Sequence, residues 1–118
     1  GAGIYPAVSD YASTTPDPIT LQHLLNQFKR AQVDVLAMEV SSHALDQGRI
    51  NGVSFSTAVF TNLTQDHLDY HHTMQEYFAA KAELFYWQGL VHGVINADDE
   101  YGQQLIATLQ TAGATYSR

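Results

Sequence analysis

The sequence predicts a three-layer α/β domain in which helices flank a mostly parallel sheet. Apolar segments rich in β-branched residues alternate with segments of helical periodicity, and this alternation indicates parallel strands joined by right-handed crossovers. Capping and turn residues stand at the junctions between these segments. With 118 residues, 45% of them hydrophobic, the chain is one domain or part of one and can bury a modest core.

The first third of the chain is predicted to be a loop followed by a helix. Residues 1–18 are dominated by Gly, Pro, Ser, Asp and Thr, which favour turns. Pro18 suits the first position of a helix and Asp17 can cap it, so we expect a helix over residues 18–31. Residues 34–40 (DVLAMEV) form a near-continuous apolar run. Such a run is typical of a parallel strand covered on both faces.

The middle of the chain contains a short helix, a strand and a longer helix. Ser41 or Ser42 can cap the short helix, and Gly48 can end it. Residues 55–62 are predicted to form the next strand. The longer helix begins after Thr73, because Glu76 stands three positions on in a capping-box arrangement. Apolar residues then recur at helical spacing up to position 85.

The last third contains one more strand and one more helix. Residues 90–96 (LVHGVIN) are predicted to be a strand. Asp98 is a good N-cap for a helix that reaches residue 109 or 110, and Gly113 stops it. We interpret the acidic run at 98–100 mainly as capping. Residues 114–118 read as the start of a further strand, and the chain opens without Met, so we expect a piece of a larger protein.

Composition excludes several classes of function. The formal net charge is −7 with only five Lys and Arg residues, which argues against a broad nucleic-acid surface. The absence of cysteine excludes a disulfide framework and a thiolate metal site. No run approaches membrane-spanning length, so no membrane insertion is predicted.

The carboxyl end of the 34–40 segment is a candidate site. Glu39 lies there, directly before two serines and a histidine, and ligands of open parallel sheets gather at the carboxyl ends of strands. Its alternative role is a solvated carboxylate where the strand stops. Arg49 follows closely and could hold a substrate carboxylate or phosphate, although an exposed Arg is usually a solvated charge.

Lys81 departs from the apolar pattern of its helix. It lies four positions after Tyr77 and four before Phe85, on or beside the buried stripe. Either its ammonium reaches water while its stem packs, or it occupies a partly dry site that favours the neutral amine. A neutral amine can add carbon dioxide, and the resulting carbamate can bind a hard cation. Upstream stand further oxygen and imidazole groups of the kind that bind metals: Asp66, His67, Asp69, His71 and His72.

Five runs, taken together, resemble the central domain of the Mur ligases. No single run is decisive, but their joint order and spacing are specific, and the resemblance covers nearly all of residues 1–118. The runs lie at residues 14–18, 39–49, 60–71, 79–81 and 95–99.

The resemblance implies an ATP-dependent amide ligase of peptidoglycan synthesis in the cytoplasm. Such an enzyme phosphorylates a carboxylate of a UDP-muramoyl peptide, and an incoming amine then attacks the acyl phosphate. The similarity points to addition of the third amino acid, meso-diaminopimelate or L-lysine, to UDP-MurNAc-L-Ala-D-Glu. By the same resemblance Lys81 is carbamylated and holds Mg²⁺ together with Glu39 and His67, which are the expected catalytic residues.

The resemblance also implies the residues that contact the UDP-muramoyl dipeptide. Position 13 is Ser here, where the family commonly has Asn, so a weaker contact is expected from Ser13. The expected substrate-binding residues are Ser13, Thr14, Thr15, Ser41, Gln47 and Arg49.

The phosphate-binding signature G-x-x-x-x-G-K-[ST] is absent from the sequence. ATP would therefore be bound mainly by other parts of a parent ligase, and we expect residues 1–118 alone to be inactive. Two alternatives stay open. One is a non-catalytic nucleotide-sugar or metal-binding domain, and the other is a different ligase of the superfamily.

Overall fold

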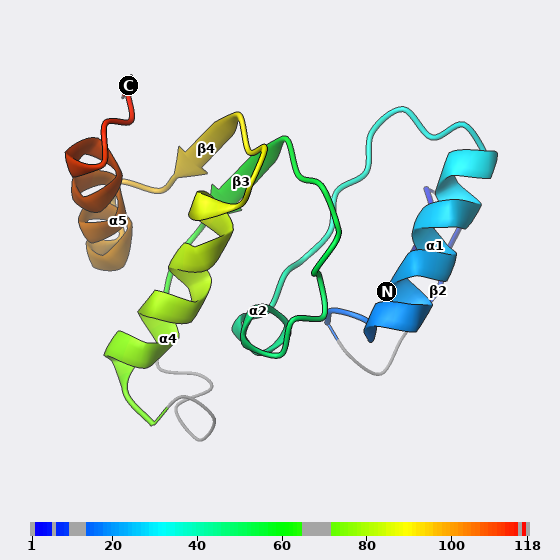
Figure 1. Cartoon of the computed structure of the whole chain (residues 1–118), viewed down its shortest axis with the longest axis horizontal. Helices are drawn as coiled ribbons and strands as arrows, with labels where there is room; N and C mark the ends of the chain where they lie inside the picture. The colour runs from blue at the N-terminus through cyan, green and yellow to red at the C-terminus, as the bar shows by residue number, and fades with distance from the viewer. Residues whose placement is uncertain (1, 6, 10–13, 65–71, 116, 118) are drawn as a thin grey trace. The chain divides into compact units, whose positions relative to one another are not determined.

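The computed structural model describes all residues except 1, 6, 10–13, 65–71, 116 and 118. The chain forms two compact units, Gly1–Val53 and Ser54–Arg118. Figure 1 shows the helices and strands of both units. The predicted α/β class is confirmed, because the second unit contains a parallel pair of strands packed against helices.

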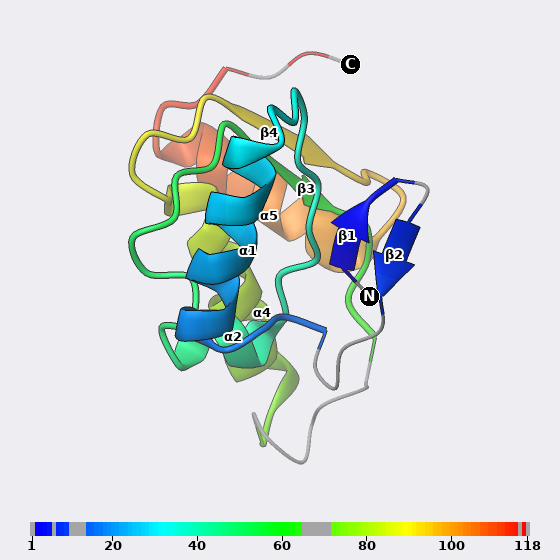
Figure 2. The same cartoon turned by 90° about the vertical axis from the view of Figure 1, so that its right-hand side faces the viewer.

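The first unit contains two short strands that the sequence did not predict. Strands β1 (Ala2–Ile4) and β2 (Ala7–Ser9) pair antiparallel, with Ala2 opposite Ser9. They lie side by side in Figure 2. The loop predicted for residues 1–18 is therefore wrong over these two segments. Three-residue strands are too short to show the period-two alternation from which a strand is recognised.

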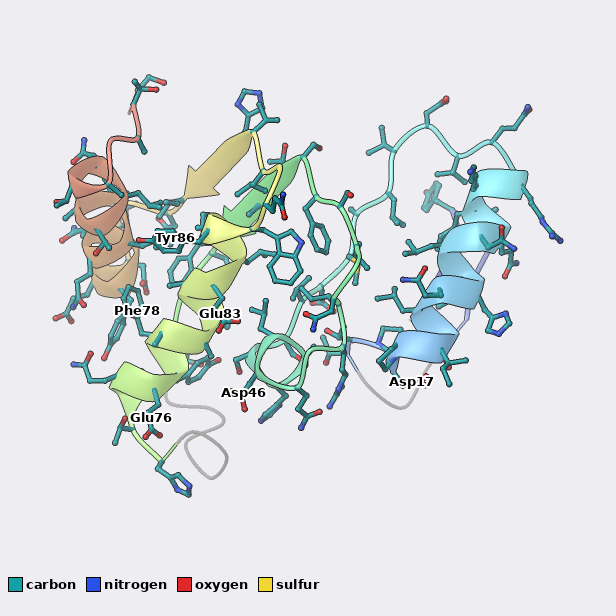
Figure 3. All side chains as sticks on the ribbon, in the orientation of Figure 1. Asp17, Asp46, Glu76, Phe78, Glu83 and Tyr86 are labelled. Atoms are coloured by element: carbon teal, nitrogen blue, oxygen red, sulfur yellow. The ribbon has the colours of Figure 1, made fainter. Side chains whose placement is uncertain are left out.

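Helix α1 (Pro18–Arg30) follows the predicted bounds closely. The Asp17 carboxylate accepts hydrogen bonds from the Thr20 N–H at 2.9 Å and from the Thr20 hydroxyl at 2.6 Å. These bonds lower the pKa of Asp17 below its ordinary value. Asp17 is labelled at the start of the helix in Figure 3. The predicted cap is confirmed, and the helix buries one apolar side: Leu21, Leu24 and Phe28.

The strand predicted at residues 34–40 does not form, and this prediction is wrong. The segment belongs to neither strand pair, and Val35 and Leu36 are exposed. A strand is held by ladder hydrogen bonds to a neighbour, and the described part of the chain places no strand beside this segment. The apolar pattern thus indicates a preference for burial but cannot supply the pairing partner. Residues 42–46 form helix α2 (Ser42–Asp46), capped by Ser41 as one of the two predicted alternatives.

The second unit is built on the parallel strands β3 (Thr57–Phe60) and β4 (His92–Ile95). Both lie inside the predicted segments 55–62 and 90–96. Ala58 and Phe60 point into the core, whereas Val59 and its partner Val94 stay exposed on the other face. Along the chain, β3 is followed by helix α4 (Met74–Ala82) and the 3₁₀ turn η1 (Glu83–Tyr86), which precede β4. Helix α5 (Glu100–Thr111) follows β4.

One hydrophobic core joins these elements. Residues from β3, α4, η1 and α5 contribute to it, and on its border Phe78 of α4 packs against Tyr101 of α5, with ring centroids 5.5 Å apart. Phe78 is labelled in Figure 3. The buried residues of this core are Ala58, Phe60, Leu63, Tyr77, Phe85 and Leu105. Within the described residues, no helix is long and apolar enough to cross a lipid bilayer.

The helix caps of the second unit partly match the predictions. Thr73 caps α4, since its hydroxyl accepts a hydrogen bond from the Glu76 N–H at 3.1 Å. Asp99 rather than Asp98 caps α5, and its carboxylate accepts from the Gly102 N–H at 3.0 Å. The prediction was therefore one residue too early. Both residues are aspartates, so residue type alone could not separate them.

Gly102 allows the start of α5 to approach the end of β4. A Cβ atom added at Gly102 would overlap the backbone oxygen of Asn96. That oxygen belongs to the backbone, so it cannot move without displacing the residue that follows β4. We therefore expect glycine to be required at this position for packing rather than for its dihedral angles.

Gly102→Ala should lower the free energy of unfolding by about 1–3 kcal/mol. An alanine within a helix ordinarily stabilises it by about 0.5–1 kcal/mol relative to glycine, so the expected sign is opposite to helix propensity. Urea denaturation followed by circular dichroism measures the change. Gly93→Ala is the comparison, because its added Cβ would lie 3.2 Å from the Phe85 side chain rather than in overlap with backbone, and it should therefore cost less than Gly102→Ala. Equal or greater stability of Gly102→Ala would contradict the close approach.

Candidate substrate and metal site

Thr15 is the centre of a hydrogen-bond network in the first unit. Its hydroxyl donates to the Glu39 carbonyl at 3.1 Å and accepts from the Ser41 N–H at 2.9 Å. The residue is fully buried, with 0% of its surface exposed. The Thr15 hydroxyl therefore fixes the backbone on both sides of Val40, although Glu39 lies 24 residues after Thr15 in the sequence.

Arg49 extends the same network. Its Nη1 donates to the Thr15 carbonyl at 3.0 Å across 34 residues, and its Nε donates to the Gln47 side-chain oxygen at 2.8 Å. A guanidinium has five N–H donors, so further donors stay available for an anionic ligand. The structure thus brings together five of the residues predicted as substrate or metal contacts: Thr15, Glu39, Ser41, Gln47 and Arg49.

The two hydroxyl groups of this network have different remaining capacity. The Thr15 hydroxyl both donates and accepts within the protein. The Ser41 hydroxyl accepts from the Ala44 N–H at 3.1 Å as the cap of α2, and it can still donate its own proton. The arrangement therefore favours Ser41 as a direct hydrogen-bond donor to a ligand and Thr15 as the residue that positions it.

The other predicted substrate residues are less defined. Thr14 is exposed, and Ser13 lies outside the described residues. The side chain of Glu39 is exposed while its carbonyl is held by Thr15, so a carboxylate stands at a fixed backbone position. Glu39 and Thr14 are accessible to a ligand.

Ser42 is a buried polar residue that the sequence did not single out as distinct from Ser41. The whole residue is 1% exposed, and its hydroxyl has no hydrogen-bond partner among the described residues. Most buried polar groups are paired, and nothing in the structure explains this exception. Both serines could cap a helix, so no sequence signal separates their roles.

Lys81 lies in the last turn of α4 and is half-buried. Its Nζ stands 5.5 Å from the centroid of the Tyr77 ring. Burial lowers the pKa of the Lys81 amino group, because desolvation disfavours the ammonium, while the negative charge of Asp99 acts in the opposite direction. The charge of Asp99 favours the ammonium, yet burial has the larger effect on the pKa of Lys81. A partly dry amine is thus compatible with the second interpretation of Lys81.

The predicted metal set is distributed over both units. Glu39 belongs to the first unit and Lys81 to the second, and His67 lies outside the described residues together with Asp66, Asp69 and His71. Among the residues that the structure describes, no three His, Asp or Glu side chains are grouped as a metal site. The joint site of Glu39, His67 and Lys81 stays a prediction.

Comparison with known proteins defines the family to which this fold belongs. The Mur ligase middle domain family matches residues 2–118, and the chain belongs to that family. The predicted family membership is confirmed.

More specific similarity is to ligases that use diaminopimelate. The UDP-N-acetylmuramoyl-L-alanyl-D-glutamate–2,6-diaminopimelate ligase of Neisseria meningitidis serogroup B is 56% identical over 110 residues, which are 93% of this chain and 22% of that protein. The ligase of the same name from Pseudomonas aeruginosa is 51% identical over 118 residues, or 99% of this chain and 24% of that protein.

A solved structure supports the same assignment of fold. A UDP-N-acetylmuramoyl-L-alanyl-D-glutamate–2,6-diaminopimelate ligase superposes with a TM-score of 0.80 at 39% identity. The match covers 92% of this chain and 22% of that one. The chain therefore spans about a quarter or less of the length of the relatives it matches.

Proposed function

We propose that this chain is part of an ATP-dependent amide ligase that adds meso-diaminopimelate to UDP-MurNAc-L-Ala-D-Glu in peptidoglycan synthesis. The names of the relatives favour diaminopimelate over lysine as the incoming amino acid. The observation that carries the proposal is the network around Thr15, because it gathers predicted contact residues from three segments. Its substrates, ATP and a UDP-linked precursor, are consistent with action in the cytoplasm.

The residues of the first unit would hold the substrate. Arg49 presents N–H donors that suit a carboxylate or phosphate, and the Ser41 hydroxyl can donate a hydrogen bond beside it. Thr15 would hold Ser41 and Arg49 in position, because its hydroxyl accepts from the Ser41 N–H and its carbonyl accepts from the Arg49 side chain. Preorganised donors of this kind cost little reorganisation when charge develops in the reaction.

The chemistry of the donor set fits a hard cation. The exposed Glu39 carboxylate and a carbamate on the half-buried Lys81 would supply oxygen ligands, which Mg²⁺ prefers, and His67 would be the third partner. When bound, Mg²⁺ would neutralise charge on the phosphoryl group that is transferred to the substrate carboxylate. Glu39 and Lys81 would hold that ion, while other parts of the ligase would bind most of ATP.

An assay of ADP release tests the proposal at two lengths of the protein. With ATP, Mg²⁺, UDP-MurNAc-L-Ala-D-Glu and diaminopimelate, we expect the full-length protein to release ADP and form an amide, and residues 1–118 alone to release none above background. Replacing diaminopimelate by lysine should reduce the rate of the full-length protein by about 10²-fold or more, because a missing polar group leaves its partners unpaired.

Two results would contradict the proposal in different ways. ADP release by residues 1–118 alone would show that the other parts of the ligase are not needed. Binding of the UDP-muramoyl dipeptide by the full-length protein without ADP release would instead indicate a non-catalytic nucleotide-sugar-binding protein.

A further inference from the structure

Helix α2 ends in a turn that fixes the backbone of Arg49. Gln47 is the C-cap of α2, and Gly48 follows in the left-handed conformation with a φ of +69°. The Gly48 N–H donates to the Leu45 carbonyl at 3.2 Å, and the Arg49 N–H donates to the Ala44 carbonyl at 2.9 Å. This pair of bonds is the Schellman arrangement, in which glycine supplies the left-handed residue. The side chains of Gln47 and Arg49 therefore start from fixed backbone positions.

The Arg49 side chain is held at two of its three nitrogen atoms. Its Nε donates to the Gln47 side-chain oxygen at 2.8 Å, and its Nη1 donates to the Thr15 carbonyl at 3.0 Å. Both acceptors are neutral, although the sequence contains 12 acidic residues and has a formal net charge of −7. The two bonds thus orient the guanidinium without neutralising its charge, and neither of them uses Nη2.

We propose that Gln47 is a positioning residue, which orients Arg49 through its Nε and, as a neutral amide, leaves the positive charge of Arg49 to an anionic group of the substrate. This role rests on the proposed function, in which the first unit binds the UDP-muramoyl dipeptide. It differs from the direct substrate contact that the family resemblance implies for Gln47. In this role Gln47 acts through Arg49, so its effect on binding depends on the guanidinium.

The chemistry of the amide explains why glutamine suits this position better than glutamate. A carboxylate would accept the Arg49 Nε–H more strongly, but its charge would pair with the guanidinium and repel an anionic ligand. The bond at Nε has a second effect. A bidentate anion cannot use Nε together with Nη2 while Nε donates to Gln47, so it meets Arg49 at the terminal nitrogens.

A double-mutant cycle tests whether Gln47 acts through Arg49. The dissociation constant of UDP-MurNAc-L-Ala-D-Glu is measured by calorimetry on the full-length protein without ATP. We expect Gln47→Ala to raise this constant about three- to tenfold, as for loss of one hydrogen bond that orients a side chain. In an Arg49→Lys background the same change should raise it less than about twofold, because lysine stays cationic but has a methylene group in place of Nε–H.

A second variant tests the need for a neutral partner. Gln47→Glu keeps the shape and an acceptor for the Arg49 Nε–H, and we expect it to raise the dissociation constant by about tenfold or more, because it pairs the charge that the ligand needs. Gln22→Glu is the matched control. Gln22 is exposed on α1, so the same change of charge there should leave the constant unaltered.

Several results would overturn this role. Equal effects of Gln47→Ala in the unmodified and Arg49→Lys backgrounds would show that Gln47 acts independently of Arg49, as a direct substrate contact would. No effect of Gln47→Ala would show that Arg49 needs no orientation by Gln47, and normal binding by Gln47→Glu would show that a neutral partner is not needed. In each of these cases the unmodified protein still binds the dipeptide. An unmodified full-length protein that neither binds it nor releases ADP would overturn the proposed function, and this role with it.

Discussion

Lys81→Arg in the full-length protein should lower the rate of ADP release by about a hundredfold or more, because a preorganised group that stabilises developing charge contributes on this scale. Arginine keeps the positive charge and a long apolar stem, so it preserves the packing and cation–π interaction of Lys81 with Tyr77. The guanidinium stays protonated and does not add carbon dioxide. The substitution therefore separates a carbamate ligand from a lysine that only packs. Steady-state ADP release at saturating Mg²⁺ measures it.

The matched control is Lys29→Arg. Lys29 is exposed in the last turn of α1, so the same chemical change there should leave the rate unaltered. A Lys81→Arg enzyme that works at close to the normal rate would show that no carbamate is required. The interpretation of Lys81 as a packed lysine with a solvated ammonium would then be correct.

The pH dependence of carbon dioxide uptake provides an independent readout of the same residue. Because burial lowers the pKa of Lys81, its neutral amine becomes populated at lower pH than in an ordinary exposed lysine. Raising the pH in the presence of ¹³CO₂ and trapping the carbamate by alkylation should label Lys81 in the folded protein at lower pH than in the urea-unfolded protein. Labelling at the same pH in both states would contradict the expected effect of burial.

Thr15→Val should lower the free energy of unfolding of the first unit by about 2–4 kcal/mol. Valine has nearly the same shape, but it leaves the Ser41 N–H and the Glu39 carbonyl without the partner that now joins them. Both hydrogen bonds are part-buried, so each unsatisfied group should cost about 1–2 kcal/mol, in the lower part of the range of about 1–3 kcal/mol for a buried polar group. Hydrogen exchange at the Ser41 amide, together with urea denaturation, measures the loss.

Two variants serve as controls for Thr15→Val. Thr15→Ser keeps the hydroxyl and should lose much less stability, since only a methyl group is removed. Thr14→Val changes an exposed neighbour and should alter stability by no more than about 0.5 kcal/mol. If Thr15→Val were as stable as Thr14→Val, the two hydrogen bonds would contribute nothing measurable to the fold.

Local chemistry made the helix starts predictable. Pro18 with Asp17, and Thr73 with Glu76, are read from adjacent positions, and the structure confirms both caps. The β-branched runs around β3 and β4 were equally informative, because each strand finds its partner within the same unit. The segment 34–40 has a similar pattern without such a partner, so composition alone overstated its structure.

The candidate site was predictable in residue type but not in arrangement. The family resemblance selected Thr15, Ser41 and Arg49, yet no spacing rule indicates that the Thr15 hydroxyl joins residues on both sides of Val40. Such contacts depend on tertiary folding over 24 to 34 residues. The Asp99 carboxylate caps α5 and also accepts from the Leu63 N–H at 3.4 Å. The second contact spans 36 residues, so the sequence did not indicate it.

The junction between β4 and α5 has a consequence for the evolution of chain length. Asn96 is tied to Thr61 and Asp99 to Leu63, while the Asn96 oxygen lies against Gly102. An inserted or deleted residue between positions 96 and 102 would shift one tie relative to the other, whereas an exposed loop end can absorb such changes. Across homologous genes the number of codons in this stretch should therefore stay constant, and changes of residue identity should concentrate at exposed positions such as Ala97 and Asp98.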